Sequence, residues 1–205
     1  MQFELGQKII DLFKKKDISN KDCKTQDIIK DGPVRAYVIL DLIKKNKINP
    51  KEIAEIGVWR GHTSIVLLRN LPSLEVFHAI DSWINYEDYQ GDNKNNETII
   101  FDKLIFEDRT HWLKDKLKIH HGFSKDTCDQ IRDNSLDLIF IDANHSYEYL
   151  LEDIKIWTPK VKKDGLIIGH DYNPKTFPGV VKAVHEVFKD NFTTELDDIW
   201  WCTKK

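Results

Sequence analysis

Two apolar segments in the second half of the chain each end in acidic and imidazole side chains. Asp142 and His145 follow the first segment, and His170 and Asp171 follow the second. Ligands of open α/β sheets bind outside the carboxyl ends of the strands, so side chains at that edge are candidates for chemistry. If both segments are neighbouring parallel strands, the four groups converge at one edge.

Two chemical uses fit this cluster. In the first, carboxylates bind Mg²⁺ or Mn²⁺, and the ion binds an acceptor oxygen and lowers the pKa of its proton. In the second, no metal takes part and a histidine accepts the hydroxyl proton, because its ordinary pKa of about 6.5 suits that role. A structural interpretation also stays open, since Asp142 is placed to cap a helix that starts near Ser146.

The turn between Glu55 and Gly61 is a second candidate for ligand binding. It follows a short apolar strand and precedes apolar residues at helical spacing, which predicts a strand–loop–helix unit. A dinucleotide fingerprint needs glycine where Trp59 stands, so the indole disfavours a pyrophosphate. The pattern E-x-G-x-x-x-G, with Gly57 between, instead resembles the first motif of class I S-adenosylmethionine-dependent methyltransferases. Asp81 ends the next strand and is placed to bind the hydroxyls of a ribose.

The elements that must position these residues alternate between short apolar strands and helical patterns from residue 51 onward, which predicts a parallel sheet with right-handed crossovers. The predicted strands are residues 52–56, 74–80, 117–120, 136–141, 165–169, 192–196 and 199–203. The last two lie too close for a crossover helix and are expected to form an antiparallel hairpin around Asp197 and Asp198. The expected fold is α/β: a Rossmann-like, seven-stranded, mostly parallel sheet with a terminal antiparallel hairpin, helices on both faces and extra N-terminal helices.

The segments outside this pattern have their own signals. The first fifty residues have helical periodicity, broken at Gly32-Pro33. We expect residues 1–50 to form an N-terminal helical cap and residues 51–205 the ligand-binding domain of a single folding unit. Residues 83–96 lack periodicity and are rich in Asn, Asp, Tyr and Gly, which predicts a long surface loop placed to close over a ligand.

The composition limits the class of partner and compartment. With a net charge of −3 over 205 residues, the chain has no electrostatic footprint of a nucleic-acid-binding protein. Its three widely spaced cysteines indicate neither a disulfide framework nor a zinc site, which favours a reducing compartment. The first residues lack a secretory signal, and no apolar run has the length of a membrane span. We therefore predict a cytoplasmic protein without nucleic-acid or membrane partners; its oligomeric state stays open, a homo-oligomer included.

The segment 137–172 carries the most specific pattern in the chain. It contains I-D-A-N-H-S-Y, Asp153, Trp157, Gly165 and H-D-Y. Together with the glycine turn and Asp81, it resembles the class I methyltransferase group called methyltransferase domain family 24, over about residues 51–172.

This resemblance implies a site for S-adenosylmethionine. The implied cofactor-binding residues are Glu55, Gly57, Trp59, Gly61, Asp81, Ser82, Ser124 and Asp142. Glu55 and the two glycines would shape the loop around the methionine part of the cofactor, and Asp81 would hold the ribose. Ser124 would lie beside the adenine, and Asp142 would border the transferable methyl group.

The same resemblance bears on the metal. The group is similar to metal-dependent sugar O-methyltransferases of the macrocin O-methyltransferase type, in which an aspartate after the fourth strand and an acidic pair after the fifth bind Mg²⁺. Asp142 and Asp171 match these positions, but His170 replaces the first acid of the pair. A nitrogen ligand favours Mn²⁺ or a softer ion. The implied metal ligands are Asp142, His170 and Asp171, while His145 becomes the preferred base, with Asp142 and His170 as further catalytic candidates.

The predicted function is transfer of a methyl group from S-adenosylmethionine to a hydroxyl oxygen. The preferred acceptor is a sugar or glycan, with a non-sugar small molecule as the alternative, and assistance by a divalent metal stays open. A nicotinamide-dependent dehydrogenase is disfavoured by Trp59 and the terminal hairpin. A non-catalytic cofactor-binding partner is disfavoured by the presence of Asp142, His145 and Asp171.

Overall fold

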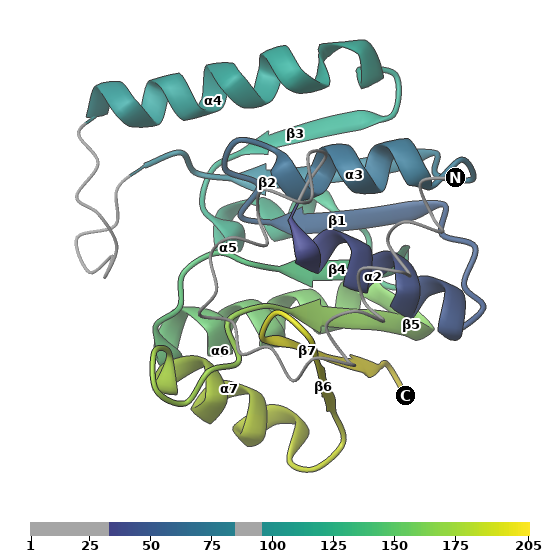
Figure 1. Cartoon of the computed structure of the whole chain (residues 1–205), viewed down its shortest axis with the longest axis vertical. Helices are drawn as coiled ribbons and strands as arrows, with labels where there is room; N and C mark the ends of the chain where they lie inside the picture. The colour runs from purple at the N-terminus through teal and green to yellow at the C-terminus, as the bar shows by residue number, and fades with distance from the viewer. Residues whose placement is uncertain (1–32, 85–95) are drawn as a thin grey trace.

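The computed structural model describes residues 33–84 and 96–205, which form a seven-stranded sheet with helices around it (Figure 1). The strands are β1 (Glu52–Ile56), β2 (Val76–Asp81), β3 (Leu117–His121), β4 (Leu136–Ile141), β5 (Val161–Gly169), β6 (Thr193–Glu195) and β7 (Ile199–Thr203). They lie in the order β3-β2-β1-β4-β5-β7-β6. Strands β1 to β5 are parallel, and β7 is antiparallel to both β5 and β6. The predicted sheet and its terminal hairpin are confirmed.

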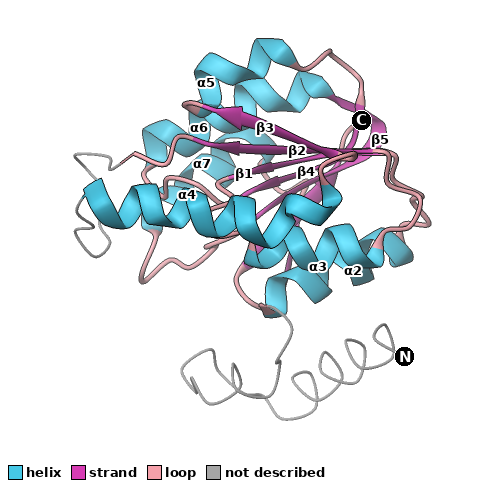
Figure 2. Cartoon of the chain, turned by 90° about the horizontal axis from the view of Figure 1, so that it is seen from above, coloured by secondary structure: helices cyan, strands magenta, loops and turns pink. Residues whose placement is uncertain are grey.

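Helices cover both faces of this sheet (Figure 2). The α-helices are α2 (Val34–Lys45), α3 (His62–Asn70), α4 (Asn96–Thr110), α5 (Ser124–Thr127), α6 (Tyr147–Trp157) and α7 (Pro178–Phe188). Short 3₁₀ turns are η2 (His111–Leu113), η3 (Cys128–Gln130) and η4 (Thr158–Lys160). Helices α2, α3 and α4 lie on one face, and α5, α6 and α7 lie on the other.

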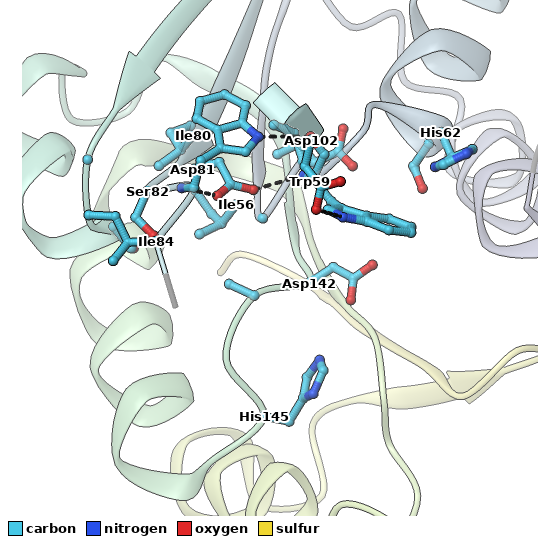
Figure 3. A pocket seen from close by; sticks show the side chains of 18 of the residues that line it. Ile56, Trp59, His62, Ile80, Asp81, Ser82, Ile84, Asp102, Asp142 and His145 are labelled. Carbon is cyan, nitrogen blue, oxygen red and sulfur yellow. Dashed lines mark hydrogen bonds between the residues drawn. The ribbon is translucent and has the colours of Figure 1, made fainter. Parts of the chain in front are cut away.

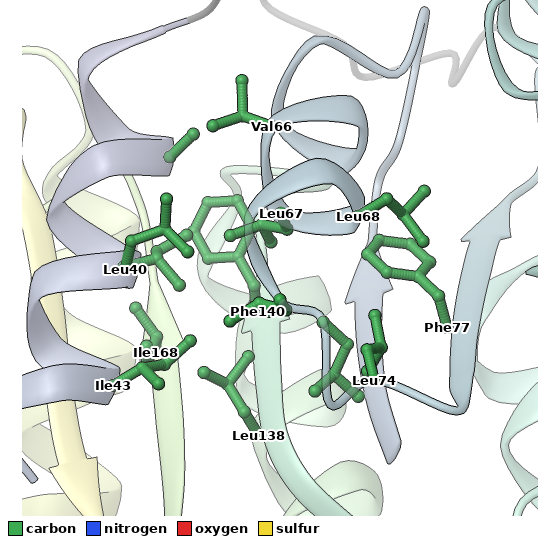
Figure 4. Packing of buried hydrophobic residues seen from close by; sticks show 14 of the residues in the cluster. Leu40, Ile43, Val66, Leu67, Leu68, Leu74, Phe77, Leu138, Phe140 and Ile168 are labelled. Carbon is green, nitrogen blue, oxygen red and sulfur yellow. The ribbon is translucent and has the colours of Figure 1, made fainter. Parts of the chain in front are cut away.

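The two-residue period of the central strands separates two hydrophobic cores. In β4, Leu138 and Phe140 face α2 and α3, whereas Ile139 and Ile141 face α6 and α7. Figure 4 shows Phe140 packed with Leu67 of α3. Because both faces are covered, the strand is apolar throughout, as expected for the centre of a parallel sheet. This burial fixes the position at which β4 ends and its polar residues begin.

Strands β2, β3 and β6 differ from their predicted bounds by one or two residues, and the start of β5 differs more. β5 begins at Val161 rather than at residue 165. Val161 is fully buried and pairs with Leu136, so the strand starts before the polar run Lys162-Lys163-Asp164. The start of β5 could not be predicted from the sequence, because the polar and largely exposed residues of this run have the composition of a turn.

Some predictions fall outside the described residues. The helices expected before residue 33 and residues 85–95 of the expected loop 83–96 lie there. The helix expected after Pro33 is confirmed as α2, whose Ala36, Ile39 and Leu42 are completely buried. Within residues 33–84 and 96–205, no helix has both the length and the apolar character needed to cross a bilayer.

Candidate active site

A pocket of about 300 Å³ lies at the carboxyl ends of β1, β2 and β4 (Figure 3). Asp142 and His145 lie across it from Asp81 and Ser82. Of the eight residues predicted to bind the cofactor, all except Gly61 line this pocket. The catalytic candidates Asp142 and His145 line it too. The structure therefore brings most of the predicted site residues around one pocket, whereas Gly61, His170 and Asp171 do not line it.

The glycine turn requires its glycines for two different reasons. Gly57 has φ +86°, and a Cβ atom there would lie 2.1 Å from the carbonyl oxygen of Asp142. The turn therefore passes directly against the end of β4. Gly61 has φ +76° and packs against the ring of Phe106, with an added Cβ 2.8 Å from it. Gly61 shapes the turn from behind and does not contact the pocket.

Glu55 is buried beneath this turn. Its Oε2 accepts a hydrogen bond of 2.5 Å from the hydroxyl of Ser64, in the first turns of α3. Burial, with a further contribution from the nearby Asp142, raises the pKa of Glu55 to about 8. The carboxyl group is thus mainly protonated at neutral pH and is held by α3 at the floor of the pocket.

Asp81 joins two turns that border the pocket. Its Oδ2 accepts a 2.8 Å hydrogen bond from the backbone N–H of Trp59, and its Oδ1 accepts a 2.7 Å bond from that of Trp83. Both tryptophans have left-handed backbones, with φ +46° and +42°. Burial raises the pKa of Asp81, and these backbone bonds oppose that shift. The carboxylate is held rigidly where the ribose was expected.

Asp102 of α4 is a pocket residue that the sequence did not reveal. It is 2% exposed and accepts 2.6 Å hydrogen bonds from Trp59 Nε1 and Arg60 Nε. Arg60 therefore binds a carboxylate rather than facing solvent alone. No motif surrounds Asp102, so only the packing of α4 over the turn brings it here.

The far end of the pocket, where adenine was expected, is built around Ser124. The indole Nε1 of Trp157 donates a 2.6 Å hydrogen bond to the Ser124 hydroxyl, which in turn hydrogen bonds to Asp153. Burial raises the pKa of Asp153 to about 7. Both α6 residues belong to the pattern that carried the family resemblance, and the structure explains why they occur together.

The groups predicted to act at the β4 and β5 ends do converge. Nε2 of His145 lies 2.7 Å from Oδ2 of Asp171, and Nδ1 of His170 lies 3.1 Å from Oδ1 of the same carboxylate. Burial would raise the pKa of Asp171, but these two imidazoles hold it far below its usual range. Burial lowers the pKa of His170, yet Asp142, Asp171 and Asp197 together raise it to about 10.

Arg35 is the second pocket residue that the sequence did not reveal. It stands in the first turn of α2, and its Nε lies 3.1 Å from Oδ2 of Asp142 and 3.1 Å from Oγ1 of Thr63. Its backbone N–H donates a 2.8 Å hydrogen bond to Asp197 in the β6–β7 turn. Helix α2 therefore contributes a cation to the site as well as apolar side chains to the core.

One group of side chains has the composition of a cation site. Asp142, His170 and Asp171 each offer a ligand atom, and these atoms lie within 4.8 Å of one another. Two carboxylates and one imidazole form a donor set that suits Mn²⁺. The residues therefore fit such an ion in type and spacing. His170 and Asp171 lie beside the pocket, and Asp142 alone of the three lines it.

The strand order, the reversed β7 and a pocket over the β1 turn define a class I methyltransferase fold. The chain is similar to the O-methyltransferase NovP, with 18% identity, a TM-score of 0.65, and 100% of this chain and 98% of that chain covered. It is also similar to an O-methyltransferase from Bacillus cereus in complex with SAH, with 16% identity, a TM-score of 0.60, and coverage of 98% and 90%. At these identities the likeness establishes the fold.

The sequence itself identifies the family. The model of methyltransferase domain family 24 matches residues 54–172, more than half of the chain. The chain belongs to this family of S-adenosylmethionine-dependent methyltransferase domains. Uncharacterized protein R132 of Acanthamoeba polyphaga mimivirus is 32% identical over 74 residues, a match that covers 34% of this chain and 34% of that protein. The matched stretch thus spans about a third of this curated relative.

Proposed function

We propose that this chain transfers a methyl group from S-adenosylmethionine to a hydroxyl oxygen, with His145 as the general base. The observation that carries the proposal is the 2.7 Å contact between His145 and Asp171 at the mouth of the pocket, next to Asp142. The Bacillus cereus protein of the same fold is in complex with SAH, which supports this cofactor here.

The proposed reaction is a direct displacement. The acceptor oxygen attacks the methyl carbon of the sulfonium, the O–C bond forms as the S–C bond breaks, and the bonding electron pair moves to sulfur. The product S-adenosylhomocysteine remains in the pocket while the hydroxyl proton passes to His145. Asp171 accepts the Nε2–H of His145 and so makes Nδ1 the basic nitrogen.

A divalent ion is the second candidate for activating the acceptor. It is supported by the spacing of Asp142, His170 and Asp171, which would hold it. When bound, such an ion supplies a positive charge that lowers the pKa of the acceptor hydroxyl. Arg35 already neutralises Asp142, and the imidazolium of His170, whose pKa is raised to about 10, already neutralises Asp171, so the residues of the chain supply positive charge at the same place. This favours the histidine base.

The proposed acceptor is a sugar or glycan hydroxyl, and a non-sugar small molecule is the alternative. Support for the sugar comes from the resemblance to macrocin-type enzymes and from the polar side of the pocket formed by Asp142 and His145. We further propose that the chain acts in the cytoplasm without nucleic-acid or membrane partners. The described cysteines, Cys128 and Cys202, are buried free thiols, which supports a reducing compartment.

Incubation with methyl-labelled S-adenosylmethionine and two acceptor panels, nucleotide sugars and phenols, tests this proposal. Each panel is run with a chelator and again with Mn²⁺. Label on a sugar hydroxyl in both conditions is the expected result. Label that appears only with Mn²⁺ would favour the metal mechanism, and label on phenols alone would replace the sugar acceptor. Binding of S-adenosylhomocysteine without any transfer would favour a non-catalytic partner, and binding of a nicotinamide nucleotide in its place would favour a dehydrogenase.

A further inference from the structure

Arg35 is held in place by contacts that leave the outer end of its guanidinium available. Its Nε donates a hydrogen bond to Thr63 Oγ1 and lies beside Oδ2 of Asp142, each at 3.1 Å. Within residues 33–84 and 96–205, neither Nη group donates a hydrogen bond to the protein. An arginine anchored through Nε presents two parallel N–H donors, the arrangement that binds a carboxylate with two hydrogen bonds.

The position of Arg35 within the pocket indicates which part of a ligand it meets. Thr63, which accepts the hydrogen bond from Arg35, is the second residue of α3, directly after the glycine turn. Arg35 and Thr63 both line the pocket. The ribose and adenine ends are marked by Asp81 and Ser124, on the side of β2 and α5. Arg35 therefore lies toward the end that is left for the amino-acid part of the cofactor.

The charges along the pocket leave one group of the cofactor without a partner. S-adenosylmethionine carries a sulfonium, an ammonium and a carboxylate, and the acidic side chains of the pocket suit only the two cations. Asp81 is already bonded to backbone N–H groups, and Asp102 to Trp59 and Arg60. A carboxylate binds strongly to a positive charge, which arginine supplies at every physiological pH.

The neighbouring imidazole does not replace this charge. His62 also lines the pocket, but burial and the nearby Arg109, Arg35 and Arg60 lower its pKa, so it is neutral at pH 7. His62 further contacts Arg109 at 2.8 Å. Arg35 is therefore the cation of this end of the pocket.

We infer that Arg35 binds the α-carboxylate of the methionine part of S-adenosylmethionine through its two Nη groups, while its Nε holds Asp142. This inference rests on the proposed function. It makes helix α2, which precedes the glycine turn, part of the cofactor site. It also links cofactor binding to the orientation of Asp142, because Arg35 holds the cofactor carboxylate and contacts the aspartate at the reaction centre.

Titration calorimetry with two probes tests this assignment. One probe is S-adenosylhomocysteine, and the other is its decarboxylated analogue, which keeps the amino group and lacks only the carboxylate. The wild-type chain is expected to bind the first about tenfold to a hundredfold more tightly, the range of a hydrogen-bonded charge pair. Arg35→Gln should abolish most of this preference, and Arg35→Lys should keep part of it.

The matched control is Arg69→Gln. Arg69 lies on α3 over the ring of Trp112, outside the pocket, so this variant removes the same charge and should keep the full preference. If Arg35→Gln weakens both probes equally, or if the wild-type chain does not distinguish them, the assignment is overturned while the cofactor proposal stands. The wild-type measurement decides this even where Arg35→Gln does not fold. If the wild-type chain binds neither probe, it is the proposed function that fails.

Discussion

Nε2 of His145 and Oδ2 of Asp171 lie 2.7 Å apart, although the two residues follow different strands of the sheet. The neighbouring β4 and β5 end at the same edge, and Asp171 adopts φ +62°, which turns its side chain back toward the loop after β4. Because a buried carboxylate that accepts Nε2–H fixes the tautomer of an imidazole, Asp171 prepares His145 to accept a proton.

Replacing the base should therefore stop the reaction without emptying the pocket. His145→Gln is expected to lower kcat about 10²- to 10⁴-fold, the usual contribution of general-base catalysis, with the affinity for S-adenosylhomocysteine nearly unchanged. Asp171→Asn should lower kcat less, since the imidazole of His145 loses the carboxylate that fixes its tautomer.

His111→Gln is the control for these two variants, since His111 is exposed in η2, away from the pocket. Its kcat should equal that of the wild-type chain. A His145→Gln enzyme with normal turnover would remove this histidine from the mechanism and leave the divalent ion as the activating group.

The buried carboxyl of Glu55 should make stability depend on pH. Burial raises its pKa to about 8 in the folded chain, against about 4.3 in an unfolded one. Between these values the folded state holds a proton that the unfolded state has lost, so the free energy of unfolding falls as the pH rises from about 4.5 to 8. Glu55→Gln stays neutral and should remove part of that fall, on the order of a few kcal/mol.

Urea unfolding at pH 5 and pH 8 measures this effect. Asp153, whose pKa burial raises to about 7, contributes with the same sign and remains in the variant, so some dependence on pH should persist. If the free energy of unfolding changes equally between pH 5 and pH 8 in the wild-type chain and in Glu55→Gln, then Glu55 ionises in the folded state as it does in the unfolded one.

The glycine turn should tolerate no side chain at Gly57. An alanine there combines a strained positive φ with a Cβ atom 2.1 Å from the backbone oxygen of Asp142. We expect Gly57→Ala to destabilise the chain by about 2–6 kcal/mol, the sum of backbone strain and overpacking, and to abolish cofactor binding. Thermal unfolding and calorimetry measure the two effects.

Gly122→Ala provides the comparison, since its added Cβ would meet only the Thr127 methyl group, at 3.2 Å. A smaller loss of stability, about 1 kcal/mol, is expected because that side chain can shift. Equal losses for the two variants would mean that the turn does not press against the end of β4.

Strands β1, β2, β4 and β5 were predictable because their apolar runs are buried and stand out from the helical patterns between them. The hairpin of β6 and β7 was predictable because its two strands lie too close together for a crossover helix. The residues at the strand ends were predictable for the same reason, since the end of an apolar run locates the edge of the sheet. Asp142, His145 and Asp171 are examples, and the structure brings all three together.

Arg35 and Asp102 could not be predicted in this way. Each belongs to a helix, α2 or α4, whose pattern indicates only which face packs on the sheet. They meet the pocket because those helices cross above the glycine turn, and no short-range spacing encodes such a crossing. A polar residue on an otherwise apolar helix face was the available signal, and it is weak because most such residues are solvated.

The most direct test of the central claim is a calorimetric titration with S-adenosylhomocysteine, once with Mn²⁺ and once with a chelator. The account predicts a dissociation constant on the order of micromolar in both solutions, because the pocket residues bind the cofactor without an ion. An absence of binding in both solutions, together with binding of a nicotinamide nucleotide, would contradict it.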